Sequence, residues 1–196
     1  MEFNPSFFAG GLKCLDFCNT FDHLHPSPAY DFLPDRATLL QWGQAAGILP
    51  PGFQDNPVAD GQFFTRALEA RALIFHLFIP FVRSGMPAEA DLALFNTFLQ
   101  DVSTRLEVVS TANGYELACR AADPLERILC EVMRSAADLL ISNQLERVRQ
   151  CEECGWLFYD STRNRSRRWC DMKLCGNKAK ARRHYERVKQ KKMATI

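Results

Sequence analysis

Residues 151–175 read CEECGWLFYDSTRNRSRRWCDMKLC and hold four cysteines in two close pairs, Cys151-x-x-Cys154 and Cys170-x4-Cys175. A tetrahedral zinc ion needs four ligands, and two short cysteine pairs that fold together supply them. The alternative is a pair of disulfides, which a reducing compartment disfavours. Four thiolate ligands leave no coordination position open for water. The pattern therefore predicts one structural zinc ion held by Cys151, Cys154, Cys170 and Cys175.

The spacing of the second pair predicts where the following helix begins. Five residues turn by about 500° on a regular α-helix, so Cys170 and Cys175 would point about 140° apart on a continuous one. We therefore expect Cys170 to precede the helix, with Asp171 as N-cap and Cys175 in the first turn. The first pair is expected to form a zinc knuckle, and residues 156–159 a strand paired with 167–169. Knuckle, hairpin and helix together describe a treble-clef-like finger.

Charge is divided between two parts of the chain. Residues 151–196 contain thirteen Lys and Arg against five Asp and Glu, whereas residues 1–150 contain eleven against eighteen. Zinc bound by four thiolates adds about −2 to the finger, which stays strongly basic. Opposite charge in two blocks indicates two modules with different partners, the alternative being a solvated basic tail. The basic block predicts an anionic partner, above all a nucleic-acid backbone.

The rest of the chain predicts a mainly helical domain. Helical spacing and capping residues predict helices at residues 35–46, 59–83, 87–103 and 123–140; Pro80 is expected to kink or end the second. The hydrophobic period changes to two on either side of Asn113-Gly114, which predicts a β-hairpin of residues 105–110 and 115–119. The period of segment 10–20 fits either a strand or a helix. We expect an α+β protein, with a helical domain over 1–146 and the finger over 147–196.

The other four cysteines lie in apolar or amphipathic segments. We expect Cys14, Cys18, Cys119 and Cys130 to be buried free thiols, which suits a cytoplasmic protein. No stretch approaches about 20 apolar residues without charge, so no transmembrane helix is expected. The N-terminus lacks the basic and apolar regions of a signal peptide, so secretion is not expected either.

The finger resembles the CGNR zinc-finger family of bacterial transcription regulators. The resemblance runs through Cys151-x-x-Cys154-Gly155, the segment LFYDSTRNRSRRWC at 157–170, and Cys175-Gly176-Asn177. The N-terminal part is similar to the companion ABATE domain, through Gly10-Gly11 and LDFCNT at 15–20. Lys178 stands where the family has its signature arginine, which keeps the charge and loses the planar fork. The resemblance implies a stress-induced transcription regulator whose finger binds DNA.

Basic side chains of the finger are the candidate nucleic-acid contacts. An extended segment would send Arg163, Arg165 and Arg167 to one side, and the helix adds further Lys and Arg. A narrow apolar stripe on that helix, marked by Ala181 and Val188 among others, is interpreted as a packing face. We expect phosphate contacts from the following set: Arg163, Asn164, Arg165, Arg167, Arg168, Lys178, Lys180, Arg182, Arg183 and Arg187.

Double-stranded DNA is the expected partner of this basic set, and RNA or an acidic protein surface are the alternatives. The last alternative would make the protein an interaction adaptor. Its acidic partner could be the N-terminal domain of a second copy, which would give a homodimer. The sequence contains no nucleophile elbow, no glycine-rich phosphate loop and no open metal site, so we expect no enzyme.

The acidic N-terminal domain carries one polar cluster in apolar surroundings. Asp16, Asn19 and His23 share a face if their segment is helical, and Arg71 lies on an apolar helix face where it would pair with Asp16. One interpretation is a small-molecule effector site formed by Asp16, Asn19 and Arg71. The other is that Asp16 and Asn19 cap or cross-link neighbouring backbone.

Overall fold

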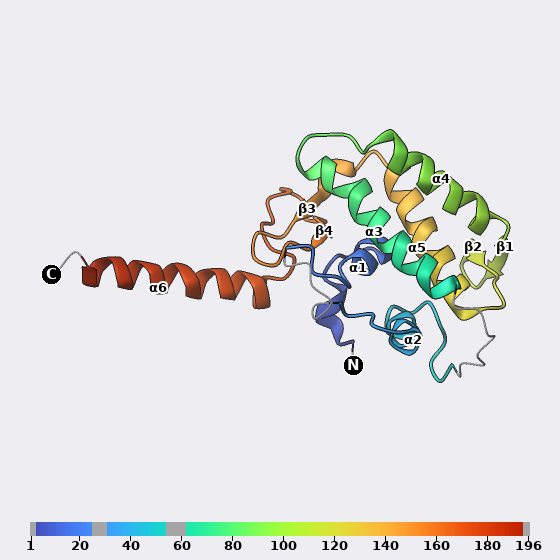
Figure 1. Cartoon of the computed structure of the whole chain (residues 1–196), viewed down its shortest axis with the longest axis horizontal. Helices are drawn as coiled ribbons and strands as arrows, with labels where there is room; N and C mark the ends of the chain where they lie inside the picture. Colours follow the sequence, from blue (N-terminus) through green and yellow to red (C-terminus); the bar gives the residue numbers. More distant parts are fainter. Residues whose placement is uncertain (1–2, 25–30, 54–61, 194–196) are drawn as a thin grey trace.

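Helix α5 (Pro124–Ile141) is the centre of the N-terminal domain in the computed structural model, which describes residues 3–24, 31–53 and 62–193. Ile128, Val132 and Met133 on this helix are fully buried. Asp123 caps its first turn by accepting a hydrogen bond from the Leu125 amide at 2.7 Å. Helices α3 (Gln62–Val82) and α4 (Glu89–Ser103) pack against α5 and against each other (Figure 1). The helices expected at 59–83, 87–103 and 123–140 are therefore present, the first of them from Gln62 on, since residues 59–61 lie outside the described part of the chain.

The short helix α1 (Lys13–Cys18) explains why its segment had no clear hydrophobic period. Five of its six residues are buried, because α1 is enclosed by α3, α5 and strand β4 (Leu157–Tyr159). A segment buried on every side gains nothing from a polar face. The single-turn helix η1 (Pro5–Phe8) precedes it and also contacts α1.

Helix α2 (Arg36–Ala45) begins and ends where the capping residues predict. Asp35 accepts a hydrogen bond from the Thr38 amide at 2.8 Å, and Gly47 follows with a φ of 68°. The helix buries Trp42, whose ring centroid lies 5.0 Å from that of Phe17 on α1. Pro80, by contrast, lies inside α3, which continues for two more residues.

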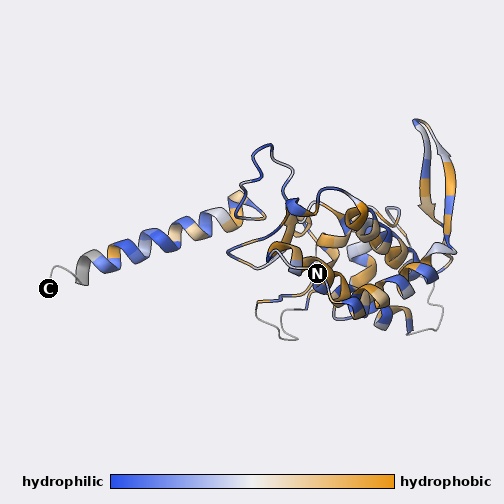
Figure 2. Cartoon of the chain, turned by 90° about the horizontal axis from the view of Figure 1, so that it is seen from above, coloured by the Kyte–Doolittle hydropathy of each residue, from blue (hydrophilic) through white to orange (hydrophobic). Residues whose placement is uncertain are grey.

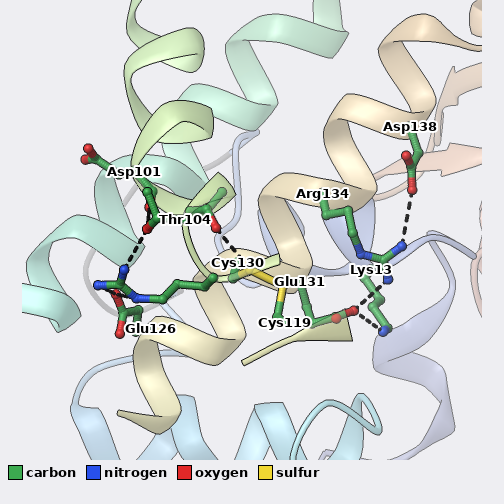
Figure 3. The surroundings of a disulfide bond; sticks show 11 residues. Lys13, Asp101, Thr104, Cys119, Glu126, Cys130, Glu131, Arg134 and Asp138 are labelled. Carbon is green, nitrogen blue, oxygen red and sulfur yellow. Dashed lines mark hydrogen bonds and ion pairs between the residues drawn. A yellow bond between two sulfur atoms is a disulfide. The ribbon is translucent and has the colours of Figure 1, made fainter. Parts of the chain in front are cut away.

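The predicted β-hairpin is confirmed as strands β1 (Leu106–Thr111) and β2 (Gly114–Cys119), which pair antiparallel. It projects from the body (Figure 2). At its base, Cys119 forms a disulfide with Cys130 of α5, with the two Cα atoms 6.1 Å apart (Figure 3). The expectation that these two cysteines are free thiols was wrong, because the hairpin returns the end of β2 to the side of α5. Cys14 and Cys18, by contrast, are buried free thiols as expected.

Strand β4 pairs with β3 (Val148–Gln150), which follows the single turn η3 (Leu145–Arg147). The register places Val148 opposite Tyr159 and Gln150 opposite Leu157. The expected pairing of residues 156–159 with 167–169 was therefore wrong. A turn within residues 162–165 keeps the later segment out of the sheet, since Arg165 adopts a left-handed φ of 47°.

The β3–β4 hairpin joins the finger to the helical domain. Val148 and Leu157 are buried in the same core as α5, and the Tyr159 amide donates to the Gly10 carbonyl at 2.8 Å. After the finger loop, a π-helical turn η4 (Met172–Gly176) leads into α6 (Asn177–Met193), which extends away from the body (Figure 1). A domain division at residue 147 stays a prediction. Among the described residues, no helix combines the length and apolarity needed to cross a bilayer.

Candidate metal centre and nucleic-acid interface

The first cysteine pair lies on a tight turn between β3 and β4. Cys151 follows β3 directly, and its carbonyl accepts a hydrogen bond from the Gly155 amide at 2.9 Å. Gly155 has a φ of 75°, and a Cβ atom there would come within 2.3 Å of the Leu24 side chain. Only glycine satisfies both the backbone conformation and this close approach. The turn that carries Cys151 and Cys154 is therefore the predicted zinc knuckle.

The second pair brackets the start of a helix, as the spacing predicts. Cys170 precedes the helical segment, and the Asp171 carboxylate caps it by accepting hydrogen bonds from the Lys173 and Leu174 amides at 2.6 and 2.8 Å. Cys175 lies in the π-helical turn, where the Gly176 amide donates to the Asp171 carbonyl at 3.0 Å. This wider turn brings the sulfurs of Cys170 and Cys175 to 3.7 Å. A regular α-helix would separate them.

The four sulfur atoms form a cluster of the right size for zinc. All lie within 4.8 Å of one another, and the Cys154 and Cys170 sulfurs are 3.6 Å apart. A tetrahedral site with Zn–S bonds of about 2.3 Å requires sulfur separations of about 3.8 Å. Three of the four cysteines are buried and the fourth is half-buried. These residues therefore fit one zinc ion with a closed, structural coordination sphere.

The ionisation of the four thiols also fits a cation at this place. Hydrogen bonds from Cys154 and Cys170 hold the pKa of Cys151 far below its usual range. Donating to Cys151 raises the pKa of both Cys154 and Cys170, and burial raises the pKa of Cys175. Zinc supplies the positive charge that lets all four ionise, so its binding releases protons.

A buried carboxylate holds the loop that follows β4. Asp160 is fully buried and accepts hydrogen bonds from the Thr162 amide, the Thr162 hydroxyl and the Arg167 amide at 2.9, 2.6 and 2.9 Å. Although burial alone would raise its pKa, these hydrogen bonds hold the pKa of Asp160 below its usual value. Sequence reasoning missed this role. The signal available was an aspartate two residues before a threonine, which is typical of a side-chain-capped turn.

The three alternating arginines of this loop make different contacts, and their segment is not extended throughout as expected, because Arg165 has a left-handed φ of 47°. Arg163 is exposed and has no partner among the described residues. Arg165 pairs with Glu146 at 2.6 Å, and the Arg167 guanidinium stacks 4.8 Å from the Phe158 ring centroid and donates to the Cys170 carbonyl. As far as the described residues go, Arg163 is therefore the free cation of the three, and Arg167 supports the finger.

Polar and aromatic groups around Arg163 enclose a shallow hollow of about 450 Å³. Asn164, Ser166 and Trp169 are among the residues that line it. Arg168 lies over the Trp169 ring at 5.2 Å and pairs with Glu152. The hollow combines an unpaired cation, polar donors and an aromatic surface, which are the groups that contact nucleotides.

The basic residues of α6 divide into those that contact the finger and those that do not. Arg182 pairs with Glu153 at 2.8 Å, and Arg183 lies 5.7 Å from the Trp169 ring centroid. Lys178, Lys180 and Arg187 are exposed and form no side-chain hydrogen bond or ion pair within the described part of the chain. The helix thus presents cations to solvent beyond its attachment.

The structure does not bring Asp16, Asn19 and Arg71 together as one site. The Asp16 carboxylate accepts a hydrogen bond from the Gly10 amide at 2.8 Å, and burial raises the pKa of Asp16 to about 7. Arg71 forms a two-pronged pair with Asp31, both distances being 2.6 Å, in place of the expected pair with Asp16. Asn19 bonds to the backbone of Leu157. All three contacts cross-link the fold.

These features define a helical domain with a four-cysteine zinc finger built onto it. Residues 13–143 match the family model described as "Putative stress-induced transcription regulator", the ABATE family, and residues 147–188 match the CGNR zinc finger. The chain belongs to the ABATE family, and its finger is of the CGNR type. Among curated protein sequences, none matches it.

Proposed function

We propose that this protein is a transcription regulator that binds double-stranded DNA through its finger, by recognition and without catalysis. The observation that carries the proposal is the charge of α6, where residues 177–193 contain eight basic side chains and one acidic. This helix extends from the body and is exposed from Lys180 to Gln190. Neutralising phosphates with such side chains releases counterions and drives binding.

The hollow at Arg163 supports the same proposal. It is lined by the loop that Asp160 holds and by Met172 at the start of η4. Arg163, Asn164 and Ser166, which line this hollow, offer donors to phosphate oxygens. The closed thiolate site gives zinc a supporting role, so recognition rests on the side chains around it. A regulator of this kind acts in the cytoplasm, where bacterial DNA is.

A salt titration tests the proposal. Binding of the zinc-loaded protein to a labelled duplex should weaken linearly in log–log form, with a slope near −0.9 for each neutralised phosphate. RNA of equal length and an acidic protein serve as competitors. Tighter binding to RNA would favour an RNA-binding protein. Binding to the acidic protein alone, or self-association that high salt dissolves, would favour an adaptor or a homodimer.

We further propose that the N-terminal domain senses a small-molecule effector. The proposed site includes Arg71 but not Asp16 or Asn19. A hollow of about 350 Å³ lies beside Arg71 and is lined by aromatic, histidine and aliphatic side chains, among them Phe21, His23 and Ala72. A thermal-shift screen of small metabolites tests this role. Ala72→Phe should fill the hollow and abolish any shift, whereas the exposed, distant Asn113→Ala should not.

A further inference from the structure

Helix α6 is attached to the finger by one side only. Ala179 is buried, and its neighbours Arg182 and Arg183 contact Glu153 and Trp169 of the finger. From His184 to Gln190 every side chain is exposed. Figure 1 shows α6 extending away from the body, and up to Gln190 the side of the helix opposite Ala179 is exposed.

The open side has a definite composition. Because an α-helix turns by about 100° per residue, the positions opposite Ala179 are Asn177, Ala181, His184 and Val188. All four are exposed, and Asn177 has no side-chain partner among the described residues. We call these four residues the outward face. The apolar stripe expected to pack is in fact solvent-exposed: Val188 on this face is 37% exposed and Tyr185 beside it is 70% exposed.

Two rows of basic side chains border the outward face. Lys180 and Arg187, seven residues apart, lie along one edge. Lys178 and Lys189 lie along the other, with Tyr185 between them. Small, uncharged or weakly basic groups thus occupy the middle of the surface, and cations occupy its margins.

We propose that the outward face of α6 enters the major groove of duplex DNA and reads base pairs there, which rests on the proposed function. A helix of 17 residues is about 25 Å long, and the major groove is about 12 Å wide and admits an α-helix. The short central side chains allow the helix axis to approach the base edges. The two basic rows then reach the phosphates on either side of the groove.

The side chains of the outward face specify which bases they contact. An asparagine amide matches the donor and acceptor of adenine, and alanine or valine methyl groups pack against the thymine methyl. Asn177 to Val188 spans about 16 Å along the axis, or about five base pairs. The recognised site is therefore a short duplex segment with A·T pairs opposite Asn177, Ala181 and Val188.

Charge favours DNA over a second copy of α6 as the occupant of this face. Eight basic residues against one acidic would make two α6 helices repel each other. The apolar groups of the outward face are also short and separated by Asn177 and His184, so they form no continuous hydrophobic seam of the kind that joins two helices.

The test is a selection of bound duplexes from a random library with the zinc-loaded full chain, followed by titration of the selected and a scrambled duplex. We expect Asn177→Ala to lower the ratio of the two affinities by about 10-fold and Val188→Ser, which places a hydroxyl against the thymine methyl, to lower it as well, with affinity for the scrambled duplex unchanged. Gln190→Ala, on the same helix and off the outward face, should leave the ratio unchanged. Lys180→Ala with Arg187→Ala should weaken both duplexes alike.

Zinc content and circular dichroism show whether Asn177→Ala, close to Cys175, retains the finger. His184→Ala lies beyond the attachment and provides a second variant, for which we expect the same loss of discrimination. Duplex binding without an enriched sequence, or with a ratio that these variants leave unchanged, would overturn base reading and leave the proposed function intact. Absence of salt-dependent duplex binding would overturn both, whichever competitor binds instead.

Discussion

The side-chain amide of Asn19 forms two hydrogen bonds with the backbone of Leu157, donating to its carbonyl and accepting from its amide, each 2.8 Å long. Asn19 ends helix α1, and Leu157 begins strand β4 of the finger. Asn19 is almost completely buried, so neither bond is exchanged easily for water. The amide occupies the place of a neighbouring strand and fixes the finger on the helical domain.

Asn19→Ala should therefore lower the free energy of unfolding by about 2–4 kcal/mol, because it leaves a buried N–H and a buried C=O of Leu157 without partners. Denaturant unfolding measures the change. Asn164→Ala, which removes an exposed asparagine of the same chain, is the matched control and should change the midpoint little. An equal midpoint for both variants would contradict the role of Asn19.

Loss of a zinc ligand should lower the zinc content of the protein and also unfold the finger. We expect one zinc ion per chain, and Cys175→Ser should lose it along with the order of the finger, since a structural site couples metal binding to folding. Elemental analysis and zinc-dependent unfolding measure both effects. Cys14→Ala removes a buried thiol of the helical domain and should keep the metal. Full zinc content in Cys175→Ser would show that the ion is held elsewhere.

Much of this centre follows from the sequence, because four ligands and their spacing constrain a metal site strongly. The position of Cys170 ahead of the helix could be predicted in this way. The strand that pairs with β4 could not be predicted, because residues 148–150 carry no pattern that distinguishes them from 167–169 as a strand. The Cys119–Cys130 disulfide and the Arg71–Asp31 pair depend on long-range packing, which spacing along the chain does not encode.

The stability of the protein should depend on pH through Asp16. Its pKa is raised by burial to about 7, above the ordinary value of 3.8, so the folded state holds a proton that the unfolded state releases. This contribution is complete below about pH 4 and is lost as the pH rises towards and through 7, with a slope of at most about 1.4 kcal/mol per pH unit.

Asp16→Asn removes this titration and keeps an oxygen that accepts from the Gly10 amide. Compared with this variant, the wild type should lose stability between pH 5 and pH 8. Denaturant midpoints across that range, measured for both proteins with zinc saturating, give the difference. Parallel pH profiles would show that Asp16 ionises normally in the folded state.

Arg163 and Arg167 should behave differently although both belong to the same basic loop. Arg163→Ala removes a free cation, so it should reduce the salt slope of duplex binding by about 1 and leave unfolding unchanged. Arg167→Ala removes the stacking on Phe158 and the bond to the Cys170 carbonyl, so it should destabilise the finger by about 1–2 kcal/mol. Salt titration and thermal unfolding of the two variants separate the roles. Identical effects of both would contradict them.

The disulfide predicts a dependence on reductant. Cys119 and Cys130 are separated by 11 residues, and closing a loop of this size stabilises the folded state by about 2–4 kcal/mol. The oxidised wild type should lose this amount when reductant is added. A Cys119→Ala, Cys130→Ala variant should be insensitive to reductant, and a wild type equally insensitive would indicate that the bond does not form in solution.

The two hydrogen bonds that join Asn19 to Leu157 and the projecting helix α6 together separate the negative and positive charge of the protein. An acidic body lies at one end and a strongly basic helix at the other, so the molecule has a large electric dipole moment along its long axis. In the field of any polyanion such a molecule turns before contact is made. The encounter would then begin with α6 foremost.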